Sequence, residues 1–98
     1  MAHHIQFEEG VESELVEASF WHDRQQAGLG DRFLVAVFDT FDRIAEMPLA
    51  YPRVRGEIRR ALVRPFLYVV YFRVDGDAVS ILGVIHGSRH PDHWQTRS

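Results

Sequence analysis

The sequence predicts an α+β fold of the order β-α-α-β-β-β, in which a helical hairpin packs on a small twisted antiparallel sheet. Two observations support this prediction. Apolar residues recur with helical spacing in the first half of the chain, and from residue 58 onward they form short runs of strand length. Because 98 residues suffice for one hydrophobic core with little margin, residues 1–98 are expected to form a single domain.

The chain is expected to begin with a strand and a helix. The alternating apolar run at residues 3–7 is typical of a strand, and Glu8 and Glu9 suit the start of a helix. An apolar stripe with helical spacing follows, and it is expected to face the core. Its members are Val11, Leu15, Val16, Ala18, Phe20 and His22.

A second helix is predicted after a short break. Gly28 and Gly30 interrupt the helical pattern, and Asp31 is the expected N-cap of the next helix, which ends at Pro48. Only a few residues separate the two helices, so they are expected to form a hairpin. The predicted apolar face of the second helix contains Phe33, Leu34, Val37, Phe38, Phe41, Ile44 and Ala45.

The second half of the chain predicts a loop and then strands. Residues 48–56 contain two prolines and are expected to form a loop. Strands are predicted at residues 58–63, 68–74 and 78–85. Asp75-Gly76 is typical of a two-residue turn between the last two strands. Because residues 68–72 are apolar without interruption, their strand is expected to be buried on both faces.

The two halves of the chain carry opposite charge. Residues 1–50 contain ten acidic residues and three arginines, whereas residues 51–98 contain eight arginines and four acidic residues. The acidic half is interpreted as solvated helix surface, and the basic half as the functional surface. All eleven basic residues are Arg, which favours geometry-specific pairing with carboxylates or phosphates. A GC-rich coding bias would produce the same usage.

The sequence favours a cytoplasmic protein without a cofactor or a membrane span. It contains no cysteine, and no apolar stretch reaches about 18 residues. His86, His90 and His93 are spaced i, i+4 and i+7, as metal ligands on one helix face would be. Gly87 and Pro91 argue against a helix at this position, so no metal site is expected.

Several short motifs occur in a distinctive order along the chain. They are Phe20-Trp21, residues 28–33, residues 44–48, residues 58–60, residues 68–71, and residues 86–91 followed by Trp94. Over nearly its whole length the chain resembles the RelE/ParE superfamily of toxins from type II toxin–antitoxin modules, also called plasmid-stabilisation proteins. The resemblance implies a helical hairpin on a twisted antiparallel sheet. It also implies a cognate antitoxin, a small DNA-binding protein that wraps the toxin with a helix or an extended tail, in a homodimer or a toxin–antitoxin heterotetramer.

The superfamily contains two branches with different targets. Proteins resembling RelE cleave mRNA on the ribosome, and proteins resembling ParE poison DNA gyrase, so a shared fold cannot choose between them. The chain has no Lys, and Tyr68 stands where the RelE-like pattern has a phosphate-binding Arg. Trp94 stands where that pattern has a Tyr or a His-Tyr pair, and an indole N–H donates only and cannot act as a base. A ParE-like gyrase inhibitor is therefore favoured.

Two alternatives remain open. The first is a RelE-like mRNA endonuclease, whose partners would be the ribosome and mRNA. Its candidate catalytic residues are His86, Arg89, Arg59, Arg60 and Arg64. His86 would act as general acid and base, and the arginines would bind phosphate oxygens. The second alternative is a decayed toxin that only binds its antitoxin. Whether the chain is an enzyme is left open, with a binding mechanism favoured.

An antitoxin tail with acidic and apolar residues is the expected complement of the arginine-rich segment. Five arginines lie between residues 53 and 64 beside a single acid, Glu57. The expected partner-binding residues are Arg59, Arg64, Arg89, Trp94 and Trp21. Alternate residues of a strand share a face, so Arg60 and Arg64 are expected on one side of their strand and Arg59 on the other.

Overall fold

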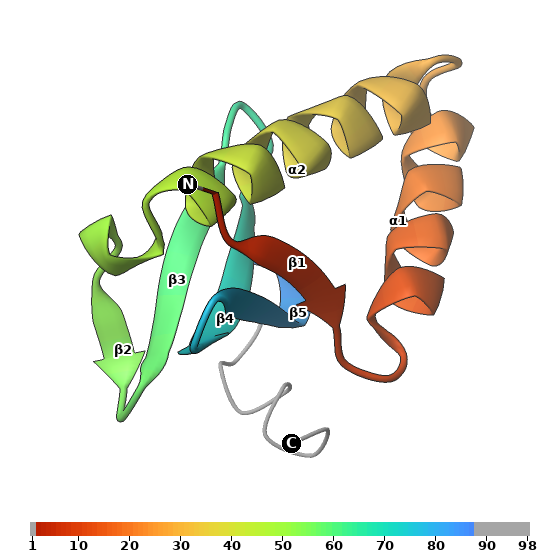
Figure 1. Ribbon diagram of the computed structural model, residues 1–98. Helices are drawn as coiled ribbons and strands as arrows, with labels where there is room; N and C mark the ends of the chain where they lie inside the picture. Colours follow the sequence, from red (N-terminus) through yellow and green to blue (C-terminus); the bar gives the residue numbers. More distant parts are fainter. Residues whose placement is uncertain (1, 88–98) are drawn as a thin grey trace.

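Two helices cover one face of a mixed β-sheet (Figure 1). The computed structural model describes residues 2–87 of the chain. Its elements are β1 (His4–Phe7), α1 (Val11–Gln25), α2 (Leu29–Glu46), the 3-10 helix η1 (Pro48–Ala50), β2 (Arg53–Arg55), β3 (Ile58–Val63), β4 (Tyr68–Asp75) and β5 (Ala78–His86). The strand order in the sheet is β1-β5-β4-β3-β2, so β4 and β5 lie at its centre. The predicted α+β class and the helical hairpin are confirmed.

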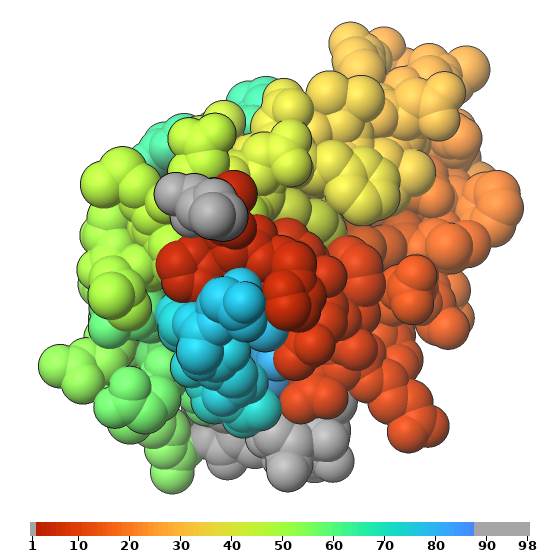
Figure 2. Space-filling model, viewed as in Figure 1, coloured from red at the N-terminus to blue at the C-terminus, as the bar shows by residue number. Residues whose placement is uncertain are grey.

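The sheet differs from the expected antiparallel one at β1. This strand pairs with β5 in parallel, whereas β2 with β3, β3 with β4 and β4 with β5 pair antiparallel. Both helices and three strands separate β1 from β5 in the chain, and so long a connection permits parallel pairing. Figure 2 shows α2, β1 and the β4–β5 hairpin packed against one another on one face of the molecule.

Two local predictions were wrong. The predicted loop at residues 48–56 contains η1 and β2, and β2 was missed because its three residues are all exposed and carry no apolar pattern. Asp31 is not the N-cap of α2. That position belongs to Gly28, whose φ of 86° is in the left-handed region that favours glycine. Asp31 lies in the first turn instead, where a carboxylate interacts favourably with the helix dipole.

The sheet buries apolar residues on both faces. The main core, between the helices and the sheet, contains Val11, Leu15, Phe33, Val37, Phe41, Ile44, Ala61, Val63, Val70, Phe72, Val79, Ile81 and Val84. A smaller cluster on the opposite face contains Val69, Tyr71, Leu82 and Ile85. The prediction that residues 68–72 form a strand buried on both faces is therefore confirmed for its central residues, Val69 to Phe72.

Three residues of the predicted apolar faces point outward instead. Val16, Phe20 and Phe38 are 51%, 60% and 49% exposed. Phe20 follows Val11 by nine residues, and nine steps of about 100° place it on the opposite side of the helix. The stripe predicted from the sequence was therefore too wide on α1, and these side chains contribute apolar surface that is open to solvent.

A β-bulge in β5 changes which of its side chains face the helices. Tyr71 pairs with Gly83 and Phe72 pairs with Ile81, so Leu82 is an extra residue on β5. As a result Ile81 and Val84 both belong to the main core although they are three positions apart. Without the bulge, strict alternation would turn the last residue of β5, His86, to the other face.

The two helices cross closely at Gly30. Its backbone N–H donates a hydrogen bond of 2.7 Å to the Asp23 carboxylate oxygen Oδ1. A Cβ atom at this position would overlap the Ser19 carbonyl oxygen of α1 and lie 2.8 Å from Asp23 Oδ1. The hairpin therefore requires a residue without a side chain at this point.

Gly30→Ala is expected to lower the free energy of unfolding by about 3 kcal/mol, the upper end of the range for overpacking, because the added methyl meets a backbone atom that cannot move alone. Urea denaturation measures the change. Gly56→Ala is the matched control, since Gly56 has open space around it and a φ of 54°. It should cost only about 1–2 kcal/mol, the strain of an alanine in the left-handed region. Equal losses in the two variants would contradict the close crossing.

Candidate functional site

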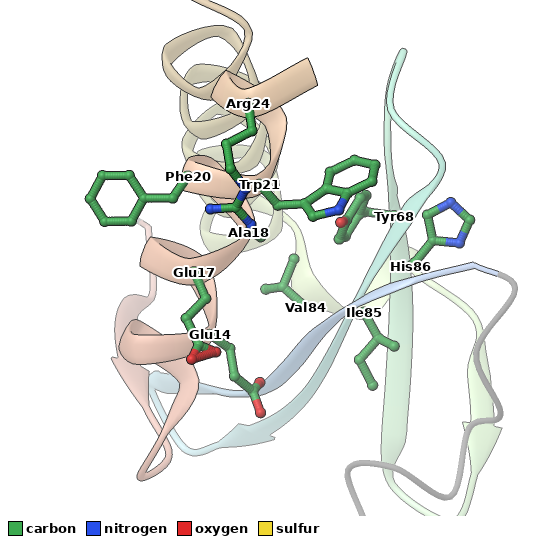
Figure 3. Close-up of a pocket in the computed structure, with 10 residues that line it drawn as sticks. All are labelled: Glu14, Glu17, Ala18, Phe20, Trp21, Arg24, Tyr68, Val84, Ile85 and His86. Carbon is green, nitrogen blue, oxygen red and sulfur yellow. The ribbon is translucent and has the colours of Figure 1, made fainter. Parts of the chain in front are cut away.

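A groove of about 830 Å³ runs between α1 and the end of the sheet at which β4 begins and β5 ends (Figure 3). Its lining consists of Glu14, Glu17, Ala18, Phe20, Trp21, Arg24, Tyr68, Val84, Ile85 and His86. Of the helical residues, Glu14, Glu17, Trp21 and Arg24 recur at intervals of three or four and so form one flank of α1. Tyr68 and His86 are cross-strand partners, so β4 and β5 together supply the other wall.

Trp21 is the central side chain of this groove. Its indole projects from α1 toward Tyr68 and His86, whereas the neighbouring Phe20 side chain points away (Figure 3). Half of the Trp21 side chain is exposed, and Tyr68 and His86 meet edge to face with 5.3 Å between ring centroids. A partly exposed Trp beside an apolar floor is typical of residues that dominate the binding energy at protein interfaces.

His22 is buried beside the groove, where its ring contacts two of the lining residues, Trp21 and Tyr68. The buried imidazole stacks on Phe33 of α2 at 4.5 Å and contacts the rings of Phe66 and Tyr68 at 5.3 and 5.5 Å. It also meets the Trp21 indole edge to face at 5.0 Å. Its Nδ1 lies 2.9 Å from the Ala18 carbonyl oxygen, an arrangement in which the ring donates from Nδ1.

The sequence placed His22 in the apolar stripe of the first helix, and its burial is confirmed. Its part in the groove was missed. Spacing along one helix indicates that a residue is buried but not that rings from two distant segments, α2 and residues 66–68, surround it.

The predicted arginines are spread over the sheet. Arg59 pairs with Phe72 of the main core, and its guanidinium donates to the Tyr51 carbonyl oxygen at 2.6 Å. It therefore secures the segment that follows η1. Arg60 pairs with Tyr71 of the opposite cluster and is exposed, so the predicted separation of Arg59 and Arg60 onto two faces is confirmed.

Arg64 is exposed beyond the end of β3. Arg60 and Arg64 form no ion pair within residues 2–87, whereas Arg53 and Arg73 pair with nearby carboxylates. Arg89 and Trp94 lie outside the described residues.

The structure does not bring His86 together with Arg59 or Arg60. His86 lines the groove on the helix side, at the Tyr68 end of β4. Arg59 lies on the same face but beside Phe72, four residues farther along β4, which is roughly 13 Å away at the rise of a strand. Arg60 faces the opposite side.

Among residues 2–87 there is no group of three side chains placed to hold a metal ion. In the same range, no helix is long and apolar enough to cross a membrane.

Comparison with known proteins gives consistent results. Residues 5–91 match the family model described as ParE toxin of type II toxin–antitoxin system, parDE. Toxin ParE2 of Mycobacterium tuberculosis, in strains H37Rv and CDC 1551, is 30% identical over 93 residues, which cover 94% of this chain and 89% of the relative.

A solved structure, the chromosomal ParDE TA system from P. aeruginosa, superposes with a TM-score of 0.76. The match covers 87% of this chain and 96% of that one at 10% identity, so this similarity concerns the fold alone.

Lowering the pH is expected to destabilise the fold through His22. Burial lowers the pKa of the imidazole below its ordinary value of 6.5, and the Asp23 carboxylate opposes this in part. The unfolded chain then binds more protons than the folded protein, so stability is full above pH 6.5 and falls as the pH drops from there toward the folded-state pKa.

Urea denaturation at about pH 7.5 and about pH 5.5 measures this loss. His22→Phe keeps an aromatic ring but cannot titrate, so it should show a smaller loss than the wild type. A variant as sensitive to pH as the wild type would show that another group is responsible.

Proposed function

The chain belongs to the ParE toxin family of type II toxin–antitoxin systems, and we propose that it acts by binding DNA gyrase and trapping it. One observation above all supports a binding mechanism over a chemical one. Among the described residues that could cleave RNA, His86 is separated from Arg59 by the length of β4 and from Arg60 by the sheet.

RNA cleavage places demands that this arrangement does not meet. The reaction needs a base for the 2′-hydroxyl, cations beside the phosphorane and an acid for the leaving oxygen, all within reach of one phosphate. His86 has Trp21 and Tyr68 as its neighbours in the groove, and Arg59 is hydrogen-bonded to a backbone carbonyl. The mRNA endonuclease is therefore kept as an outcome of the test and is not the preferred function.

A cognate antitoxin is the second proposed partner, and the groove is where we place its docking segment. Trp21 offers a half-exposed indole, and Val84 contributes to an apolar floor. On the opposite face of the sheet, Arg60 and Leu62 alternate along β3, Arg64 follows in the next turn, and all three are exposed. An acidic and apolar tail would complement this second surface.

Induction of the toxin alone in a sensitive host tests the gyrase proposal. We expect filamentous cells and induction of the DNA-damage response, with messenger RNA intact. Tyr71→Asp is the control for non-specific effects, because it places a carboxylate in a buried apolar cluster and should abolish folding. Ribosome-dependent cuts within codons, mapped by sequencing RNA ends, would favour the endonuclease. Unimpaired growth with folded protein present would favour a decayed toxin.

Arg64→Ala is expected to weaken binding of the antitoxin without changing the stability of the toxin, because the side chain is exposed and forms no described ion pair. The loss should be about 2–5 kcal/mol if the pair is buried in the complex and much less if it lies at the rim.

Arg59→Ala should also weaken binding, but it should in addition lower stability by about 1–3 kcal/mol through loss of the bond to the Tyr51 carbonyl. Calorimetry at low and moderate salt, together with urea denaturation, separates the two effects. Unchanged affinity in both variants would place the antitoxin elsewhere.

A further inference from the structure

We propose that the open edge of β1 accepts an extended segment of a partner protein in which apolar residues alternate with basic ones. The segment adds a strand to the sheet and packs its apolar side chains against Phe38 of α2. β1 lies outside both the groove and the arginine-bearing face of β3. The inference therefore goes beyond the contacts with gyrase and the antitoxin proposed above.

The backbone of β1 has unused hydrogen-bonding groups. β1 stands at the end of the strand order, next to β5, and it lies open on the face of the molecule seen in Figure 2. Its His4 donates the backbone N–H to the Asp77 carbonyl oxygen at 3.0 Å, which fixes the phase of the ladder. Alternate residues turn toward the same neighbour, so Ile5 and Phe7 turn their N–H and C=O groups outward. Within residues 2–87 no further segment forms a hydrogen bond with these groups.

β1 lacks the features that usually protect an edge strand from pairing. Such features are prolines, charged side chains and bulges. The residues His4–Phe7 include no proline, acid, lysine or arginine, and their register with β5 is regular. Because the strand has only four residues, an occupant also needs side-chain contacts beside the edge.

Phe38 supplies such a contact. Its half-exposed ring meets Phe41 edge to face with 5.7 Å between centroids, and the Phe41 ring lies 5.5 Å from that of Phe7 in β1. Ile5 and Phe7 are themselves only partly buried against the core. An added strand turns alternate side chains toward the helices, where they cover Ile5, Phe7 and the open side of Phe38.

Acidic residues surround the edge. The hydrogen bond to His4 places Asp77 at the start of β1, and Glu9 lies two residues beyond its end. Asp42 follows Phe38 by one turn of α2. The three acids are exposed and form no ion pair within residues 2–87. They favour a basic occupant, whereas a second copy docked through its own β1 would bring like charges together.

Hydrogen exchange of backbone amides, followed by NMR, tests strand addition directly. The probe is a seven-residue peptide in which valine alternates with arginine. In the free protein, the Ile5 and Phe7 amides should exchange quickly, and the Gln6 amide, which the ladder directs toward β5, should exchange slowly. Saturating peptide should slow exchange at Ile5 and Phe7 roughly tenfold or more.

Three altered peptides separate backbone pairing from side-chain contact. One carries N-methyl groups on its valine amides and another carries them on its arginine amides. Only one of these two sets faces β1, so one isomer should lose roughly tenfold in affinity and the other should keep it. The third peptide has glutamate in place of arginine, and it should bind about tenfold more weakly because it meets the acids around the edge.

Variants of the protein locate the site. Phe38→Ala should reduce the affinity for the valine–arginine peptide roughly tenfold, and its matched control is Phe20→Ala, an equally exposed phenylalanine on α1. Asp42→Asn should reduce it about two- to fivefold. Its matched control is Asp39→Asn, an exposed acid of the same helix that is turned about 100° away from Phe38. Both controls should bind like the wild type.

Four outcomes would overturn the proposal. They are failure of the peptide to bind, unchanged exchange at Ile5 and Phe7 in its presence, and equal affinities of the two N-methyl isomers. The fourth is dimerisation of the chain alone with protection of both amides, which sedimentation and exchange would detect and which would assign the edge to a second copy. These measurements involve neither toxicity nor gyrase, so their failure is distinguishable from failure of the proposed function.

Discussion

The packing of His22 against Phe33, Phe66 and Tyr68 is the interaction on which the groove depends. It joins the end of α1 to α2 and to the start of β4. Trp21 is the residue before His22 in α1. The packing of His22 therefore fixes the direction of the Trp21 indole, which projects toward Tyr68 on the sheet. Burial lowers the pKa of this imidazole, so the packing favours its neutral form.

The helices could be predicted from the sequence because their apolar residues repeat with a clear period, as Phe33, Val37, Phe41 and Ile44 do on α2. The strand β4 could be predicted from its uninterrupted apolar run. The direction of β1 could not be predicted, since alternation is the same in parallel and antiparallel strands. The bulge at Leu82 was equally hidden, because almost every position of β5 is apolar and no change of phase is visible. Short, exposed β2 carried no pattern at all.

The candidate site was predicted only in part, for the same physical reasons. Trp21 could be singled out because Phe20 and Trp21 are adjacent on a helix and cannot both face the hydrophobic core of the protein. Its neighbours Tyr68 and His86 could not be assigned to the same place, because the bulge decides which way His86 points. Counting arginines identified a basic region. Alternation along β3 predicted that Arg59 and Arg60 lie on opposite faces, and their pairing with Phe72 and Tyr71 confirms it.

The outer strand of the sheet has a consequence for the protein when its antitoxin is absent. β2 has three residues, two of them arginines, and its register with β3 is irregular. Open edges of sheets are templates for pairing with a second chain, and short, charged, irregular edges suppress such pairing. At the β2 edge the chain therefore has little tendency to pair with a second copy and extend its sheet.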